Sequence, residues 1–213
     1  LRLAQDGVFN LDDEVNEHLK TWRLKGPNGW RPSATIRQLL AHTAGMKAFG
    51  SACYPRDADL PTLDQVLNGL PPAITAPIEV ISLPGICYRY AGSGYCVLQK
   101  LVEDKTGTSF ADAMRTLVLE PLGMANSTFE HPLPEKYWPN AAVGHHSLAQ
   151  APAPERWLAF PETASSGLWT TAMDLAKVVI EIQTAVIGQP SKVLSSAMAV
   201  EMLKRHAKNA PVG

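Results

Sequence analysis

The chain has almost no net charge and no long apolar run, and both absences exclude classes of function. Its 19 basic and 20 acidic side chains leave a formal net charge of -1, so its charge favours neither nucleic acid nor an anionic membrane as a partner. No uninterrupted apolar stretch approaches the roughly 18 residues that a membrane-spanning helix needs. The sequence therefore predicts no nucleic-acid partner and no membrane span.

Cysteine is also scarce, and no metal site is indicated. The three cysteines, Cys53, Cys87 and Cys96, are odd in number and lack metal-site spacing. We expect them to be buried as small apolar residues, and a Cys87–Cys96 disulfide stays open as an alternative. His145 and His146 are adjacent but have no supporting carboxylate, which is typical of exposed loop residues. The sequence thus predicts no metal and no other cofactor.

Helix start and stop signals, in contrast, are frequent. Thr35 with Gln38 forms a capping box, which predicts a helix that runs to His42 and is stopped by Gly45. His42 at that helix end is expected to be structural, because an imidazole suits the negative end of the helix dipole. The first seven residues have the pattern of a helix tail closed by glycine rather than that of a signal peptide.

Further helices are predicted along the rest of the chain, whereas strand signals are few. The predicted helices span residues 62–69, 93–105, 109–120, 171–187 and 195–205. In the helix at 171–187 the predicted buried face consists of Leu175, Val179, Ile182 and Val186. Only residues 80–82 and 89–90 suggest short strands. The predicted secondary structure is therefore a mainly helical body with long proline-rich loops. Long ordered loops often carry functional residues.

One short sequence run places a tyrosine hydroxyl at the start of a predicted helix. Pro84-Gly85 leads into Tyr90-Ala91-Gly92-Ser93-Gly94-Tyr95, where the predicted helix at 93–105 begins. The Tyr90 hydroxyl would then lie on a turn, where it can face a cleft. A catalytic tyrosine of this kind also needs a nucleophile, and the sequence encodes no obvious one.

Five segments, in the order of the chain, match the motifs of one enzyme family. The patterns are L-D-x-P-V, I-R-x-L-L-x-H-T-[SA]-G, P-G-x-x-x-x-Y-[SA]-x-x-G-Y, x-P-L-G-M-x-x-[ST]-x-F and [AG]-G-L-x-[ST]-T-x-x-D-L-A. They fall on residues 11–15, 36–45, 84–95, 120–129 and 166–176, with Glu14 in place of the usual proline. Over nearly its whole length the chain therefore resembles the serine β-lactamase and penicillin-binding-protein family, in its class C-like branch. That branch also includes serine esterases and D-aminopeptidases.

The resemblance implies an α+β, β-lactamase/transpeptidase-like fold and a covalent serine mechanism. In that mechanism a lysine and a tyrosine help to deprotonate the serine, which attacks an ester or amide carbonyl and forms an acyl-enzyme. Tyr90 falls on the catalytic tyrosine, whereas Tyr88 lies two residues too early in the motif. Gly92 falls on a substrate-binding asparagine, and its missing amide favours esters or other amides over β-lactams. Tyr54, in a loop that the resemblance places at the cleft rim, is a candidate substrate contact.

The motif that would carry the nucleophile is absent. No serine lies three residues before any lysine, so there is no S-x-x-K. A literal K-T-G occurs at Lys105-Thr106-Gly107, but it lies at a predicted helix end, where Gly107 acts as the cap. We therefore expect residues 1–213 to form a single, incomplete domain, with the nucleophile, the lysine and most of the sheet outside it.

Two hypotheses of function follow. The first is a serine hydrolase that acts on a β-lactam, a D-amino-acid peptide or a short-chain ester, so that a small molecule or peptide is the expected partner. The alternative is a catalytically inactive fragment or a binding module of the same fold. The resemblance implies a periplasmic or secreted location, and the sequence does not indicate an oligomeric state.

Overall fold

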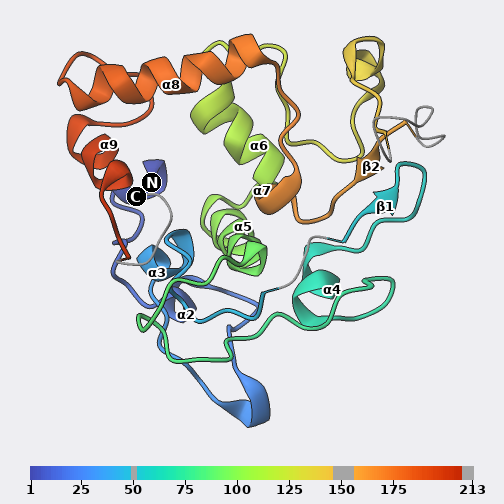
Figure 1. Ribbon diagram of the computed structural model, residues 1–213, viewed down its shortest axis with the longest axis vertical. Helices are drawn as coiled ribbons and strands as arrows, with labels where there is room; N and C mark the ends of the chain where they lie inside the picture. Colours follow the sequence, from blue (N-terminus) through green and yellow to red (C-terminus); the bar gives the residue numbers. More distant parts are fainter. Residues whose placement is uncertain (49–51, 146–155, 208–213) are drawn as a thin grey trace.

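Helices dominate the computed structural model, which describes residues 1–48, 52–145 and 156–207 (Figure 1). The α-helices are α1 Arg2–Gln5, α2 Val15–His18, α3 Ile36–Leu40, α4 Leu63–Asn68, α5 Gly92–Thr106, α6 Phe110–Met114, α7 Thr163–Ser166, α8 Ala172–Val186 and α9 Ser196–Leu203. Two 3₁₀ segments span Pro27–Gly29 and Glu135–Asn140, and a π-helical turn spans Arg115–Leu119. The strands are β1 Tyr54–Pro55 and β2 Leu158–Ala159.

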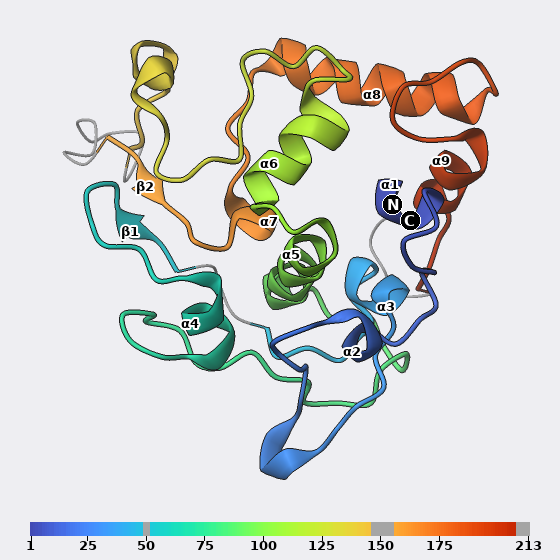
Figure 2. The same ribbon diagram turned by 180° about the vertical axis from the view of Figure 1, so that it is seen from behind.

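The helix α5 lies at the centre of the molecule. It packs against α2, α3, α4, α6 and α7, as the two opposite views show (Figures 1 and 2). Val97 and Leu101 are almost fully buried on it, and Gly107 ends it with a φ of +70°. The predicted helix at 93–105 is therefore confirmed, and the K-T-G sequence is a helix end as expected.

Within the described residues the apolar core consists of two clusters. The first joins α2, α3, α4 and α5 through side chains such as Val15, Ile36, Val66 and Val97. The second joins α8, α9 and the π-helical turn. The helix α1 lies beside α9 (Figure 2), because the Ser195 N–H donates to Gln5 Oε1 over 2.6 Å.

The predicted helix starts are confirmed by their caps. Thr35 and Thr62 each complete a capping box, with Gln38 and Gln65 respectively. The helix α3 ends at Leu40, however, two residues before the predicted end. The reason is that His42 takes a left-handed backbone conformation with a φ of 56°, which no α-helix can accommodate.

The predicted strands are wrong. Val80 makes only an isolated antiparallel bridge with Met46, and residues 89–90 are not in a strand. Among the described residues the only sheet is the antiparallel pair β1–β2, in which Tyr54 faces Ala159 and Pro55 faces Leu158. Two-residue strands leave too short an alternation for sequence periodicity to detect.

The predicted buried face of α8 is confirmed only in part, because Ile182 and Val186 are half-buried and Val186 packs against the second cluster. Leu175 and Val179 are 48% and 50% exposed, since α8 lies along one edge of the molecule (Figure 1). The buried residues of α8 are instead Asp174, Glu181 and Ala185. Glu181 is held there because its Oε1 accepts the N–H groups of residues 192, 193 and 194. The apolar spacing predicted the helix correctly, but it did not predict which side of the helix is buried along its whole length.

The remaining expectations about cysteines and membrane spans have mixed outcomes. All three cysteines are free, so the Cys87–Cys96 disulfide is wrong. Cys96 is buried as expected, but Cys53 and Cys87 are exposed. Within the described ranges no helix is both long and apolar enough to cross a membrane. Of the histidine pair, His146 lies outside the described residues.

Candidate active site

Tyr90 lies at the end of an extended segment, directly before α5. Ala91 is the N-cap of α5 and has extended backbone angles, so the chain turns into the helix just after the tyrosine. The Tyr90 side chain is 67% exposed. An exposed phenol on a short turn before a well-buried helix is held by a rigid element and still open to a ligand.

Three tyrosine rings surround the imidazole of His42. The ring centroid of His42 lies 4.6 Å from that of Tyr90, 5.3 Å from that of Tyr95 and 5.9 Å from that of Tyr88. Tyr95 comes from the first turn of α5, whereas His42 follows α3. The helix pair α3–α5 therefore positions this aromatic cluster, which we call the tyrosine cluster (His42, Tyr88, Tyr90 and Tyr95).

Backbone hydrogen bonds fix the segment that carries Tyr90 to the turn after α3. The Gly85 N–H donates to Thr43 O over 2.7 Å, and the Arg89 N–H donates to His42 O over 2.8 Å. Gly85 has a φ of +85°, a conformation that glycine adopts without strain. The Pro-Gly start of the tyrosine run is thus the turn that brings the run back against residues 42–43.

The tyrosine cluster lines one wall of an open cavity of about 420 Å³. Arg37, Glu201 and His206 also line it. Arg37 forms ion pairs with both Asp12 and Glu201, so its charge is already balanced by two carboxylates. The lining of the cavity therefore includes both an exposed phenol and an arginine whose charge is balanced.

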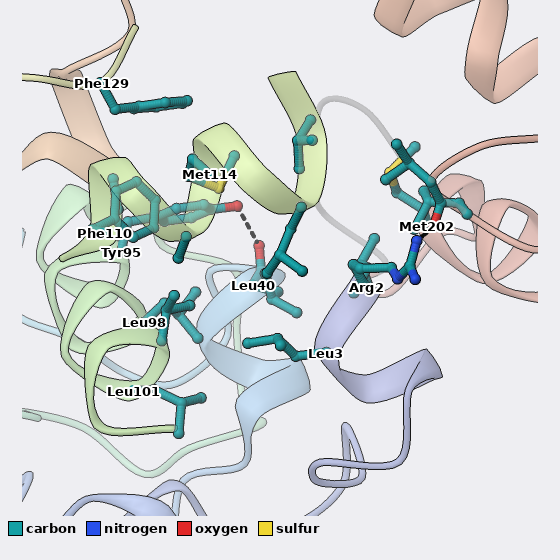
Figure 3. Close-up of a pocket in the computed structure, with 18 of the residues that line it drawn as sticks. Arg2, Leu3, Leu40, Tyr95, Leu98, Leu101, Phe110, Met114, Phe129 and Met202 are labelled. Atoms are coloured by element: carbon teal, nitrogen blue, oxygen red, sulfur yellow. Dashed lines mark hydrogen bonds between the residues drawn. The ribbon is translucent and has the colours of Figure 1, made fainter. Parts of the chain in front are cut away.

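A second cavity of about 400 Å³ adjoins the first and is almost entirely apolar. Figure 3 shows its lining, which includes Leu98, Leu101, Phe110 and Phe129. Tyr95 borders both cavities, and its hydroxyl donates to Leu40 O over 3.1 Å (Figure 3). Burial raises the pKa of Tyr95. Tyr95 is therefore fixed as a neutral phenol and is poorly suited to act as a base.

His42 is held neutral in the cluster. Burial lowers its pKa from the ordinary value of 6.5, because a partly desolvated ring disfavours the charged form. Ser93, the serine next to the cluster, is 1% exposed and donates its hydroxyl to Lys47 O over 2.9 Å. A buried hydroxyl that already has a partner is poorly placed to act as a nucleophile.

Of the three residues that the sequence singled out, only Tyr90 lines the cavity. Tyr90 borders the cavity, and Gly92 lies two residues further on, as the first residue of α5. Tyr54 lies in β1, is 7% exposed, and accepts the Ile74 N–H on its hydroxyl over 3.1 Å. A buried ring whose hydroxyl already has a partner is poorly placed to contact a substrate.

Sequence reasoning placed Tyr90 but missed the histidine beside it. The H-T-A-G motif marked His42 only as a helix end, and no spacing rule shows that residues 42 and 90 meet. In the described part of the chain no group of three His, Cys, Asp or Glu side chains is suited to a metal ion.

The sequence of this chain is similar to those of known proteins. The sequence model of the Beta-lactamase family matches residues 1–212. "Protein flp" from Staphylococcus aureus strain N315 is 31% identical over 130 residues, which is 61% of this chain and 25% of that protein. "Esterase EstB" from Burkholderia gladioli is 32% identical over 155 residues, or 68% of this chain and 38% of that protein.

A solved structure shows the same fold. It is that of "EstCE1, a hydrolase with promiscuous acyltransferase activity", which superposes with a TM-score of 0.73 at 23% identity. The match covers 96% of this chain and 59% of that chain, so the β-lactamase/transpeptidase-like fold expected from the motifs is confirmed. This chain covers only 25% of the length of the staphylococcal protein.

Proposed function

This chain belongs to the Beta-lactamase family, whose model matches residues 1–212, and we propose that the protein carrying it is a serine hydrolase. It would open an ester or amide carbonyl through an acyl-enzyme. The observation that carries the proposal is the position of Tyr90. Its phenol is exposed on the wall of a cavity, at the start of the central helix, in the motif position of the family's catalytic tyrosine.

In the proposed reaction Tyr90 moves a proton twice. Its ionised oxygen takes the proton from a serine hydroxyl as the serine oxygen bonds to the carbonyl carbon. The phenol then returns that proton to the leaving alcohol or amine as its bond to carbon breaks. In the second half of the reaction Tyr90 takes a proton from water as the water oxygen bonds to the acyl carbon. It then returns that proton to the serine oxygen as the bond from carbon to serine breaks and the acid leaves.

Positive charge must support the ionised phenol. Tyrosine has an ordinary pKa of about 10, and a nearby cation favours the charged form. Arg37, which also lines the cavity, is engaged by two carboxylates, so it is not the free cation that this step needs. We propose that both the serine and a lysine come from residues outside this sequence, which contains no S-x-x-K, and that all of them form one domain.

A short-chain ester is the proposed first substrate to test. Gly92 stands where the family pattern has a substrate-binding amide, so a β-lactam or D-amino-acid peptide would lose that contact. The names of the two relatives, an esterase and a hydrolase with acyltransferase activity, support the same order of preference. Rates with p-nitrophenyl acetate, a chromogenic cephalosporin and a D-alanyl peptide amide would rank the three classes. Faster turnover of the cephalosporin would reject the preference for esters.

The alternative is an inactive protein or a binding module of the same fold. The observation that favours it is the absence of S-x-x-K from the 213 residues. A fluorophosphonate probe applied to the intact natural protein decides between the two, since it labels only an activated serine. One covalent adduct by intact mass supports the hydrolase. No adduct, under conditions that label a control esterase, supports the binding module.

A further inference from the structure

His42 is bonded to both neighbours of Tyr90 in the chain. The Arg89 N–H donates to the His42 backbone oxygen over 2.8 Å, and the Ala91 N–H donates to His42 Nδ1 over 3.2 Å. The ring of the same histidine lies against the Tyr90 ring at 4.6 Å between centroids. One residue thus fixes the backbone on each side of the tyrosine and supports its ring.

The bond from Ala91 also defines the protonation state of the imidazole. A backbone N–H can only donate, so Nδ1 must present its lone pair to Ala91. A neutral imidazole carries one proton, which therefore lies on Nε2. If the ring takes a second proton, Nδ1–H and the Ala91 N–H become two donors that face each other, and the bond is lost.

The backbone conformation of His42 indicates a specific requirement at this position. Its φ of 56° is left-handed, a region that non-glycine residues seldom occupy and that Asn, Asp and His tolerate best. The Thr43 N–H bond to Gln38 O, at 2.8 Å, holds this turn after α3. Strained positions of this kind concentrate at functional sites, where the surrounding structure keeps them in place.

We propose that His42 is the positioning residue for Tyr90, which it holds through the Arg89 and Ala91 peptides as a neutral imidazole protonated on Nε2. The link to turnover rests on the proposed hydrolase function, whereas the hydrogen-bonded clamp does not. Because protonation breaks the bond to Ala91, acidification would release the peptide that follows Tyr90. His42 would then set the acid limb of the pH profile, below its ordinary pKa.

Other titratable groups face the same space and must be separated from His42. They are Tyr88, Tyr90 and Tyr95 of the tyrosine cluster, together with Arg37, Glu201, His206 and Leu1, which line the same cavity. Of these, His206 is the other imidazole, and its Nε2 bonds to Glu201 O at 3.0 Å. His206→Asn is therefore the matched control for any titration in the weakly acidic range.

Nitrogen NMR of the natural protein, with all of its nitrogens labelled, tests the clamp without any turnover. We expect the His42 ring to be the Nε2–H tautomer at neutral pH, to titrate below about pH 6.5, and to change the Ala91 amide shift as it does so. An Nδ1–H tautomer, or an Ala91 amide that does not follow the His42 titration, would overturn the proposal. Because this readout needs no substrate, it stands even if the protein proves not to be a hydrolase.

Two variants of His42 test the effect on turnover. Asparagine in His42→Asn tolerates the left-handed backbone and offers Oδ1 to the Ala91 N–H, but it does not titrate. Phenylalanine in His42→Phe keeps an aromatic ring and loses the acceptor. We expect His42→Asn to exceed His42→Phe in kcat by at least about tenfold, because small misplacements of a catalytic group can cost about 100-fold.

The pH profiles complete the test. In the native protein and in His206→Asn, kcat is expected to fall on the acid side of the pH profile. In His42→Asn this fall in kcat is expected to be absent, whereas KM should not account for the difference. Equal kcat for the two His42 variants, or an unchanged acid limb in His42→Asn, would refute the positioning role. If His42→Phe does not fold, as judged by near-UV circular dichroism, the acid limb of His42→Asn and the NMR tautomer still decide.

Discussion

Replacing Asp174 with alanine is expected to destabilise the protein by about 2–3 kcal/mol. Asp174 is 1% exposed, although it lies in the first turn of the largely exposed helix α8. Its carboxylate accepts the Asn126 N–H at 2.9 Å, the Ser127 hydroxyl at 2.9 Å and the Lys177 ammonium at 2.7 Å. These bonds join the fourth and fifth motif segments, which also pair through Thr128 and Trp169.

The magnitude follows from what each partner does once the carboxylate is gone. Ser127 keeps a hydroxyl partner, Thr170, at 2.8 Å, and the Lys177 side chain, 40% exposed, is hydrated by water. The Asn126 N–H alone is left without its acceptor. One orphaned donor and two weakened contacts give about 2–3 kcal/mol rather than the 3–5 kcal/mol of a fully buried broken ion pair.

Urea denaturation of the native protein and three variants measures this prediction. Asp174→Asn keeps one acceptor oxygen and should cost less than Asp174→Ala, whereas Lys177→Met should cost at most about 1 kcal/mol. The melting temperature of Asp174→Ala should fall by about 4–12 °C for a domain of this size. A loss below about 0.5 kcal/mol for Asp174→Ala, or an equal loss for Lys177→Met, would refute the reasoning.

The same carboxylate makes stability depend on pH in a defined direction. Burial disfavours its ionisation, but the hydrogen bonds from Lys177, Asn126 and Ser127 outweigh burial and hold the pKa of Asp174 below its usual value. The ionised form is thus favoured by folding. Its contribution is present above the unfolded pKa of about 3.9 and is lost as the pH falls through the lower folded pKa. The difference in free energy of unfolding between the native protein and Asp174→Asn should therefore become smaller at acid pH.

Three further substitutions and one labelling experiment have clear expected outcomes. Gly45→Ala should unfold or strongly destabilise the protein, because Gly45 has a φ of +69° and a Cβ there would lie 2.2 Å from Ser82 O; a melting temperature near that of the native protein would contradict this. Thr35→Ala and Thr62→Ala should each cost about 0.5–2 kcal/mol in urea denaturation, since each loses a capping box. Burial raises the pKa of Cys96, so a maleimide should label the two exposed cysteines within minutes and Cys96 only after unfolding, as mass spectrometry of peptides would show.

Local rules predicted the helices well because caps and stops are encoded within a few residues. The capping boxes at Thr35 and Thr62 and the terminating glycine at 107 were all readable from the sequence and all formed. The buried side of α8 was not readable. Its apolar residues lie on more than one face. The burial of Asp174 depends on its bonds to the distant residues 126 and 127, and that of Glu181 on its bonds to the loop at 192–194 that follows the helix.

The candidate site was predicted in part for the same reason. The motif containing Tyr90 is contiguous, so its position before α5 followed from the sequence. The contact between His42 and Tyr90 joins residues 48 positions apart and depends on the left-handed turn at His42. Local sequence signals predicted only that a helix ends near His42, so they could not predict this contact. The buried position of Tyr54 similarly depends on its pairing with Ala159, more than 100 residues away.

The most direct test of the central claim compares two phenols of the same cluster. Tyr90→Phe and Tyr88→Phe remove hydroxyls that both border the cavity, but only Tyr90 holds the motif position. Measured as the rate of fluorophosphonate labelling of the intact natural protein, Tyr90→Phe should fall by at least about 100-fold, the lower range for loss of a general base. Tyr88→Phe should keep at least about a tenth of the native rate. Labelling of Tyr90→Phe at the native rate, or an equal loss in Tyr88→Phe, would contradict the assignment of Tyr90 as the proton-transferring residue.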